Sequence, residues 1–118
     1  MKKVNQILIG LVGLLIGSCT SNTIQEIQPP IPVGTPITYT TYIKPIFDAK
    51  CVGCHGGGSQ YPNLETFTQV KDGCVNGNVF CRIRLDNLSC GGVMPQSGKM
   101  SQQTIDLIKL WKTQGYLN

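Results

Sequence analysis

Histidine and acidic side chains are scarce in this chain. Its 118 residues include one histidine, and Asp and Glu together number six. No pair of carboxylates, no serine–histidine arrangement and no glycine-rich phosphate-binding loop stands at the spacing that hydrolases or kinases require. The sequence therefore argues against hydrolytic and phosphoryl-transfer chemistry.

Positive charge is also modest. The formal net charge is +4, and Lys2 and Lys3 at the N-terminus supply two of these charges. A nucleic-acid-binding domain normally gathers Lys and Arg on one face. So small an excess of positive charge leads us to expect no nucleic-acid partner.

The chain lacks a hydrophobic run long enough to span a bilayer. The apolar run Ile7–Ile16 has ten residues, whereas a transmembrane helix needs about 20. A short apolar run behind two lysines is typical of a secretory signal. It closes at Gly17-Ser18-Cys19, which resembles the lipobox of bacterial lipoproteins; an ordinary signal with an incidental cysteine is the alternative.

The N-terminal pattern predicts three parts. Residues 1–18 are expected to be a lipoprotein signal peptide, and Cys19 is expected to become the lipid-carrying N-terminus. Several acyl chains anchor a protein firmly to a membrane, so the predicted location is the bacterial cell envelope, outside the cytoplasm. Residues 19–37, rich in Pro, Thr and Ser, are predicted to be a flexible linker, and residues 38–118 the folded domain.

Six cysteines stand out in so short a chain. A domain of this size buries a small core and is usually marginal in stability without reinforcement. So many cysteines indicate that disulfides, a metal or a covalent cofactor supply it.

Hydrophobic spacing in the folded part predicts an all-α domain with three main helices. Ile43, Ile46 and Phe47 follow helical spacing and predict a helix from about Thr41 to Lys50, with Pro45 in its first turn.

Two further helices follow from capping residues. We expect Asn63 to cap a second helix that Gly73 ends, and Ser101 to open a third that Gly115 ends. Residues 74–100 should be mostly loop, with at most one short helix near Val79–Leu85.

The chemistry is concentrated at the end of the first predicted helix, in Cys51-Val52-Gly53-Cys54-His55. Two thiols at this spacing can add to the two vinyl groups of a haem, and the adjacent imidazole can bind the iron. The motif predicts one covalently attached haem c per chain. A thioredoxin-like pair, a structural disulfide and a zinc site are the alternatives.

The other axial position falls to a methionine, because His55 is the only histidine. Met94 lies in a glycine-rich loop, whereas Met100 precedes a helix and pairs with Ile105 as a hydrophobic staple. We therefore predict Met94 as the ligand and Met100 as the alternative. Thioether ligation raises the reduction potential and fills the site, which favours electron transfer over catalysis.

Together with the haem motif, three other segments resemble a class I c-type cytochrome domain of the small monohaem bacterial lipoprotein kind. They are Ile43–Phe47, Met94-Pro95 and Ile108–Trp111. The resemblance implies helices wrapped around a haem with one exposed edge, and a carbonyl of Pro62 that accepts the proton of the ligand histidine. It also implies that Phe47 and Trp111 pack between the first and last helices.

Three cysteines remain outside the haem motif, in a compartment where thiols oxidise. A two-residue turn at Gly77-Asn78 would bring Cys74 opposite Cys81, and this pairing is preferred. Cys90 is the alternative partner of Cys81 and would restrain the loop of Met94.

The predicted function is a membrane-tethered cytochrome, not an enzyme, that carries single electrons between a redox donor and an acceptor protein. One alternative is a haem enzyme or sensor with an open sixth position, peroxidase-like or gas-binding. The other is a haem-free module held by disulfides or zinc, in which Cys74, Cys81 and Cys90 are available as ligands.

Overall fold

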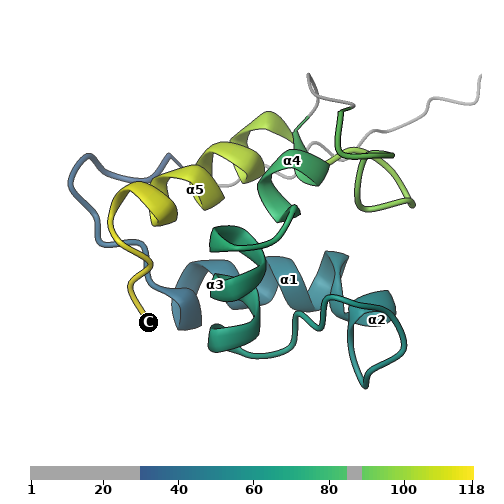
Figure 1. Cartoon of the computed structure of the whole chain (residues 1–118). Helices are drawn as coiled ribbons and strands as arrows, with labels where there is room; N and C mark the ends of the chain where they lie inside the picture. Colours follow the sequence, from purple (N-terminus) through teal and green to yellow (C-terminus); the bar gives the residue numbers. More distant parts are fainter. Residues whose placement is uncertain (1–29, 85–88) are drawn as a thin grey trace, which may run out of the picture.

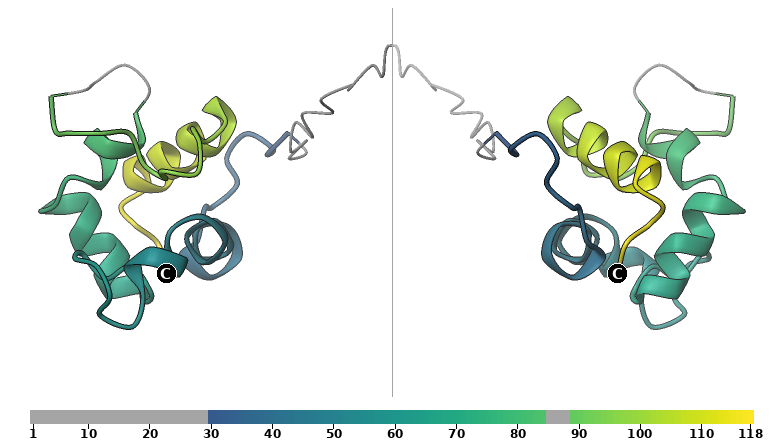
Figure 2. Two further views of the ribbon diagram at one scale, coloured as in Figure 1. Left: turned by 90° about the vertical axis from the view of Figure 1, so that its right-hand side faces the viewer. Right: turned by 90° about the vertical axis from the view of Figure 1, so that its left-hand side faces the viewer.

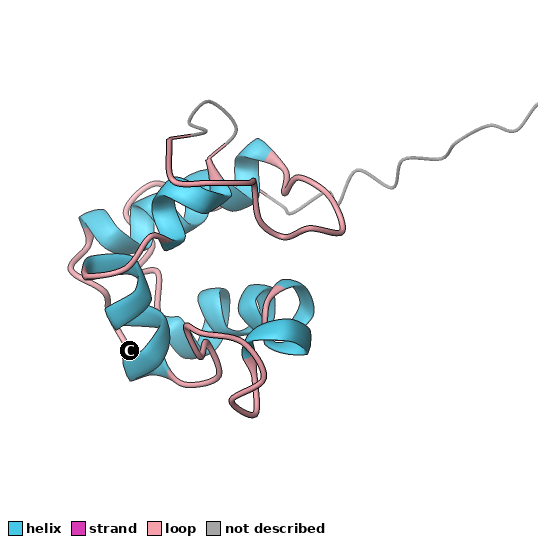
Figure 3. Cartoon of the chain, turned by 45° about the vertical axis from the view of Figure 1, so that its right-hand side comes forward, coloured by secondary structure: helices cyan, strands magenta, loops and turns pink. Residues whose placement is uncertain are grey.

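The computed structural model describes residues 30–84 and 89–118 (Figure 1). The predicted signal peptide and Cys19 lie outside this part of the chain. Helices connected by loops make up the fold, and no strand occurs in the described residues (Figure 3). This confirms the predicted all-α class. The elements in chain order are η1 (Tyr39–Ile43), α1 (Lys44–Lys50), α2 (Val52–His55), α3 (Phe67–Val75), α4 (Val79–Ile83) and α5 (Gln102–Thr113).

The first predicted helix is present and begins two residues early, as the π-helical turn η1 that runs into α1. Thr38 caps it, because its side chain accepts a hydrogen bond from the amide of Thr41. The amide of Lys44 donates to the carbonyl of Tyr39 in the wider π-helical pattern. That pattern lets the helix continue into Pro45, which has no amide hydrogen to give to an α-helical ladder.

The second predicted helix is present, but both of its predicted ends are wrong. Helix α3 begins at Phe67, and Thr66 is its N-cap instead of Asn63. The hydroxyl of Thr66 accepts from the amide of Gln69 at 3.4 Å, and the Gln69 side chain accepts from the amide of Thr66 at 3.1 Å. This reciprocal capping box satisfies two otherwise unpaired amides, which a lone Asn63 cap does not.

Gly73 does not end α3, which continues to Val75. It is buried, and a Cβ atom at this position would lie 3.0 Å from Cγ2 of Val79 and 3.1 Å from Cδ2 of Leu64. Glycine therefore allows α4 and the segment before α3 to approach the helix closely. The residue serves packing, not helix termination.

Helix α5 confirms the third prediction. The hydroxyl of Ser101 accepts from the amide of Thr104 at 3.1 Å. At the other end Gly115 has a φ of +86°, and the amide of Tyr116 donates to the carbonyl of Trp111 at 3.0 Å. These are the features of a helix that stops at a left-handed glycine. The predicted short helix is also present, as α4.

Replacing Ser101 by alanine should lower the free energy of unfolding by about 1 kcal/mol, because the first turn of α5 then loses the acceptor for one amide. Gln103→Ala, at an exposed position in the same turn, is the matched control and should change it by less than about 0.5 kcal/mol. Urea unfolding followed by circular dichroism measures both. Equal effects of the two substitutions would contradict the capping role.

The core gathers around α5. Trp111 is completely buried, and aromatic rings of Tyr39, Phe67 and Tyr116 lie 6.1, 6.3 and 4.8 Å from its ring. Phe47, from α1, is buried in the same core. The first and last helices therefore share one apolar centre. Figure 1 shows α3 below α4 and α5.

The N-terminal segment packs onto the end of α5. The side chain of Gln114 accepts from the amide of Ile37 at 2.7 Å and donates to the carbonyl of Thr35 at 3.0 Å. Thr38 forms a parallel bridge with Leu117, and Figure 2 shows the C-terminus beside the start of η1. Thr35 and Ile37, which fall in the predicted linker, thus belong to the packed unit.

Candidate functional site

A cavity of about 620 Å³ lies among the described residues. This volume falls within the roughly 300–1,000 Å³ range of cofactor and small-molecule sites. Its walls come from α1, α2, α3, α4 and the loop before α5. The apolar side chains on its walls include those of Phe47, Leu64, Val79 and Ile83.

The predicted haem-binding motif forms one helical turn at the cavity wall. Cys51 is the N-cap of α2, and its carbonyl accepts from the amides of Cys54 and His55 at 3.1 and 2.8 Å. All three residues line the cavity. Cys51 and Cys54 are free thiols, the first half-buried and the second exposed. The turn thus presents two thiols and an imidazole to one space.

Burial raises the pKa of the Cys51 thiol to about 11. Removal from water disfavours the thiolate, so this thiol stays protonated at neutral pH. In the absence of a bound group Cys51 is therefore a weak nucleophile and a poor partner for thiol exchange. This argues against the thioredoxin-like alternative.

A backbone carbonyl orients the imidazole of His55. Its Nδ1 atom lies 2.9 Å from the carbonyl oxygen of Pro62. A carbonyl only accepts, so Nδ1 donates the hydrogen, and in the neutral imidazole Nε2 then keeps its lone pair. That tautomer is the one in which a histidine binds a metal through Nε2, with its ring held by the second hydrogen bond. The contact expected from the cytochrome resemblance is thus present.

The loop around His55 is itself held in place. The hydroxyl of Ser59 donates to the carbonyls of Cys54 and Gly56 at 2.7 and 2.8 Å, and the amide of Leu64 donates to the carbonyl of His55 at 2.8 Å. The backbone that carries the thiols and the imidazole is therefore restrained on both sides.

The two candidate methionines occupy different places. Met94 is half-buried and lines the cavity together with His55. Met100 is 6% exposed, lies in the hydrophobic core at the start of α5, and does not line the cavity. Of the two, only Met94 shares a space with the imidazole.

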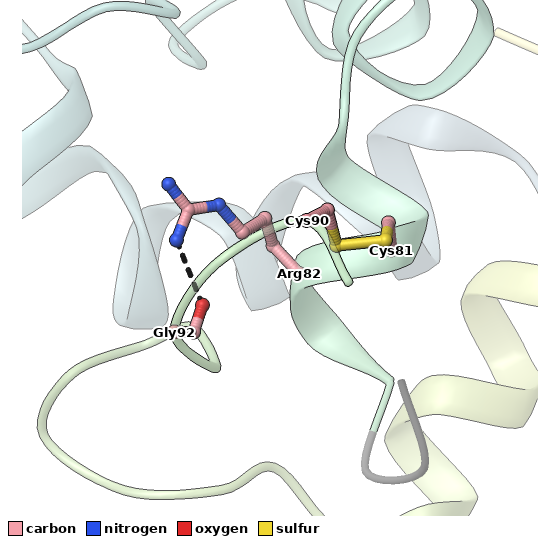
Figure 4. Close-up of a disulfide and its surroundings, with 4 residues drawn as sticks. All are labelled: Cys81, Arg82, Cys90 and Gly92. Atoms are coloured by element: carbon pink, nitrogen blue, oxygen red, sulfur yellow. Dashed lines mark hydrogen bonds between the residues drawn. A yellow bond between two sulfur atoms is a disulfide. The ribbon is translucent and has the colours of Figure 1, made fainter. Parts of the chain in front are cut away.

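The preferred pairing of Cys74 with Cys81 is wrong. The disulfide joins Cys81 to Cys90, with Cα atoms 6.1 Å apart (Figure 4). Cys74 is a buried residue of α3 and Cys81 lies in α4, so the segment between them connects two helices and is not a hairpin turn. The alternative pairing considered from the sequence is confirmed.

Cys74 is a buried free thiol. Burial, with a smaller contribution from the nearby Cys51 thiol, raises its pKa to about 12. Cys81 and Cys90, being joined, offer no thiolate to a metal. The described residues contain no group of three or more His, Cys, Asp or Glu side chains placed to hold a metal ion, which gives the zinc alternative no support.

The cavity suits a large, mostly apolar group attached through sulfur. Apolar side chains make up much of its lining, and two thiols and an oriented imidazole lie on its wall with the thioether of Met94. Polar side chains in its lining, among them Lys50, Gln60, Asn76 and Asn78, can contact charged substituents of such a group.

Two cavity residues had no motif in the sequence to mark them. Gly73 matched a helix stop, and its close contacts depend on where α4 and Leu64 pack. Arg82 lines the cavity and donates to the carbonyl of Gly92 at 2.9 Å. The paired glycines at 91 and 92 were the only signal that a side chain approaches that backbone closely.

Comparison of the chain with protein-family models, with curated proteins and with solved structures found no match. The resemblance to class I c-type cytochromes therefore stays a prediction, carried by the motifs and by the contents of the cavity. No helix in the described residues is both long and apolar enough to cross a membrane.

Proposed function

We propose that the chain is a membrane-tethered monohaem c-type cytochrome that carries single electrons between redox proteins of the bacterial cell envelope. One observation carries the proposal: Cys51, Cys54, His55 and Met94 line one cavity of suitable volume. In this proposal the two cysteines attach the porphyrin by thioether bonds, and His55 and Met94 are the axial ligands of iron.

The chain's own residues prepare each ligand for its role. Pro62 keeps Nε2 of His55 available by holding its Nδ1 proton. Met94 supplies a soft thioether, which favours the ferrous state and raises the potential. If His55 and Met94 both bind the iron, oxygen and peroxide would have no site on it. The bound haem supplies one-electron chemistry, and the protein holds and insulates it.

The tether completes the proposal. A lipid on Cys19 would keep the domain at the membrane surface, where donor and acceptor proteins are within reach. The linker up to the first packed residues would let the domain turn toward each partner.

The proposal predicts covalent haem in protein exported by a host that attaches haem to cytochromes. Mass spectrometry after denaturation should show one porphyrin per chain. The double substitution Cys51→Ser/Cys54→Ser should abolish the added mass completely, because no thiol remains at the cavity wall. Cys74→Ser is the matched control and should keep it, because that thiol is not in the haem motif. Exported wild-type protein without colour or iron would overturn the proposal.

A spectrum of the oxidised protein separates electron carrier from open-site enzyme or sensor. The cytochrome resemblance leads us to expect a weak far-red absorbance band from methionine–iron ligation. A high-spin spectrum without this band would assign the protein to the class with an open sixth position.

A further inference from the structure

Three consecutive contacts join α4 to the loop that carries Met94. Cys81 forms the disulfide with Cys90. The guanidinium of Arg82 donates to the carbonyl of Gly92 at 2.9 Å (Figure 4). The carbonyl of Arg82 accepts from the amide of Met94 at 2.8 Å. Two neighbouring residues of α4 therefore contact three residues of the loop, which are Cys90, Gly92 and Met94.

Glycine makes the middle contact possible. Gly91 has a φ of +101°, and a Cβ atom there would lie 2.7 Å from Nη1 of Arg82. The guanidinium therefore lies directly against the loop backbone. A glycine-rich segment has many accessible conformations, so without these contacts the loop would present Met94 to the cavity only part of the time.

We propose that Cys81 and Arg82 are positioning residues that keep Met94 at the cavity, so that it remains an axial ligand. We call these two residues and their three contacts the α4 clamp. The inference rests on the proposed function, since it assigns the clamp a role toward haem ligation. A disulfide and two hydrogen bonds reduce the conformations available to the loop, and so lower the cost of holding Met94 in place.

A positioning role of the α4 clamp predicts effects that a contribution to overall stability alone does not. An external ligand can bind ferric iron only in molecules whose Met94 is not bound to the iron. The apparent affinity of that ligand therefore measures the fraction of such molecules. Loosening the clamp should therefore increase the affinity for imidazole, weaken the far-red band and lower the reduction potential. Substitutions that only reduce global stability should leave these three properties unchanged under native conditions.

Arg82→Ala is the first test, made on haem-loaded, full-length protein. Loss of one hydrogen bond should increase imidazole affinity roughly threefold to tenfold. Arg82→Lys keeps a hydrogen-bond donor and the charge but not the planar guanidinium group. Its imidazole affinity should lie between that of Arg82→Ala and that of wild type. Lys99→Ala removes an exposed positive charge away from the cavity lining, and should leave the affinity unchanged.

Opening the disulfide is the second test. A dithiol reductant gives two electrons and two protons to the Cys81–Cys90 bond, yields two thiols, and is itself oxidised to a cyclic disulfide. Alkylation with iodoacetamide prevents the bond from re-forming, and ferricyanide then reoxidises the iron. Imidazole affinity should rise about tenfold or more, because loop entropy is regained. Unreduced, alkylated protein controls for reaction at Cys74.

The outcomes separate this inference from the proposed function. Wild type without covalent haem overturns both. Wild type with haem and a far-red band, but with imidazole affinity unchanged in Arg82→Ala and in the reduced, alkylated protein, overturns the clamp alone. Because reduction starts from folded wild type, the test does not depend on whether a cysteine variant folds. Increased affinity with covalent haem and circular dichroism unchanged supports the clamp.

Discussion

Replacing Met94 by alanine is expected to lower the reduction potential of the haem protein by on the order of 100 mV, since axial ligands set haem potentials over a range of about 0.8 V. The thioether that stabilises the ferrous state is lost, and one face of the cavity opens to water and external ligands. Met94 and His55 line the same cavity, so the substitution should change the haem site and leave the rest of the fold unchanged. A potentiometric titration, with imidazole binding followed by absorbance, measures both changes.

Met100→Ala is the matched control for this prediction. Met100 is 6% exposed and packs in the core outside the cavity, so its truncation should lower the free energy of unfolding by about 2–5 kcal/mol. The potential and the far-red band should not change in the folded protein. The reverse pattern, with the potential changed by Met100→Ala and not by Met94→Ala, would transfer the ligand role to Met100.

Trp111→Ala is expected to cost about 3–5 kcal/mol in the free energy of unfolding. The side chain is fully buried among three aromatic rings, and its indole N–H donates to the carbonyl of Leu117 at 2.7 Å. The free energy of unfolding of a small domain is only about 5–15 kcal/mol. This one substitution should therefore remove a large part of the stability. Because Trp111 is the only tryptophan, circular dichroism in urea is the suitable measurement.

Two further variants identify the cause of the Trp111 effect. Trp111→Phe keeps an aromatic ring but removes the donor to Leu117, and should cost less than alanine. Leu110→Ala, at a position 39% exposed on the same helix, should cost less than about 1 kcal/mol. An equal loss at positions 110 and 111 would show that helix propensity, and not the aromatic core, accounts for the change.

Local signals predicted where the main helices lie, but they did not place the start of α3. Periodic apolar residues located α1, and the Ser101 cap located α5, because these signals are contained within a few residues. The start of α3 was misplaced because Thr66 and Gln69 cap each other and Asn63 does not. Reciprocal caps need two residues to be considered together.

The site was predictable to the extent that it is contiguous in sequence. Cys51, Cys54 and His55 form one turn, so their spacing places them at one wall. The disulfide was not fixed by spacing, because Cys74, Cys81 and Cys90 allow three pairings. Only the folded structure shows that Cys74 is buried and that Cys81 meets Cys90. Arg82 also escaped prediction, since its contact depends on a loop ten residues away.

The bridge between Thr38 and Leu117 determines how the domain can be attached to a solid support. Both ends of the packed unit meet there, and among the described residues none after Ser97 lines the cavity. A protein immobilised on an electrode through its C-terminus would thus be held next to Thr38, where the packed unit begins. The attachment would be made through a segment that does not line the cavity.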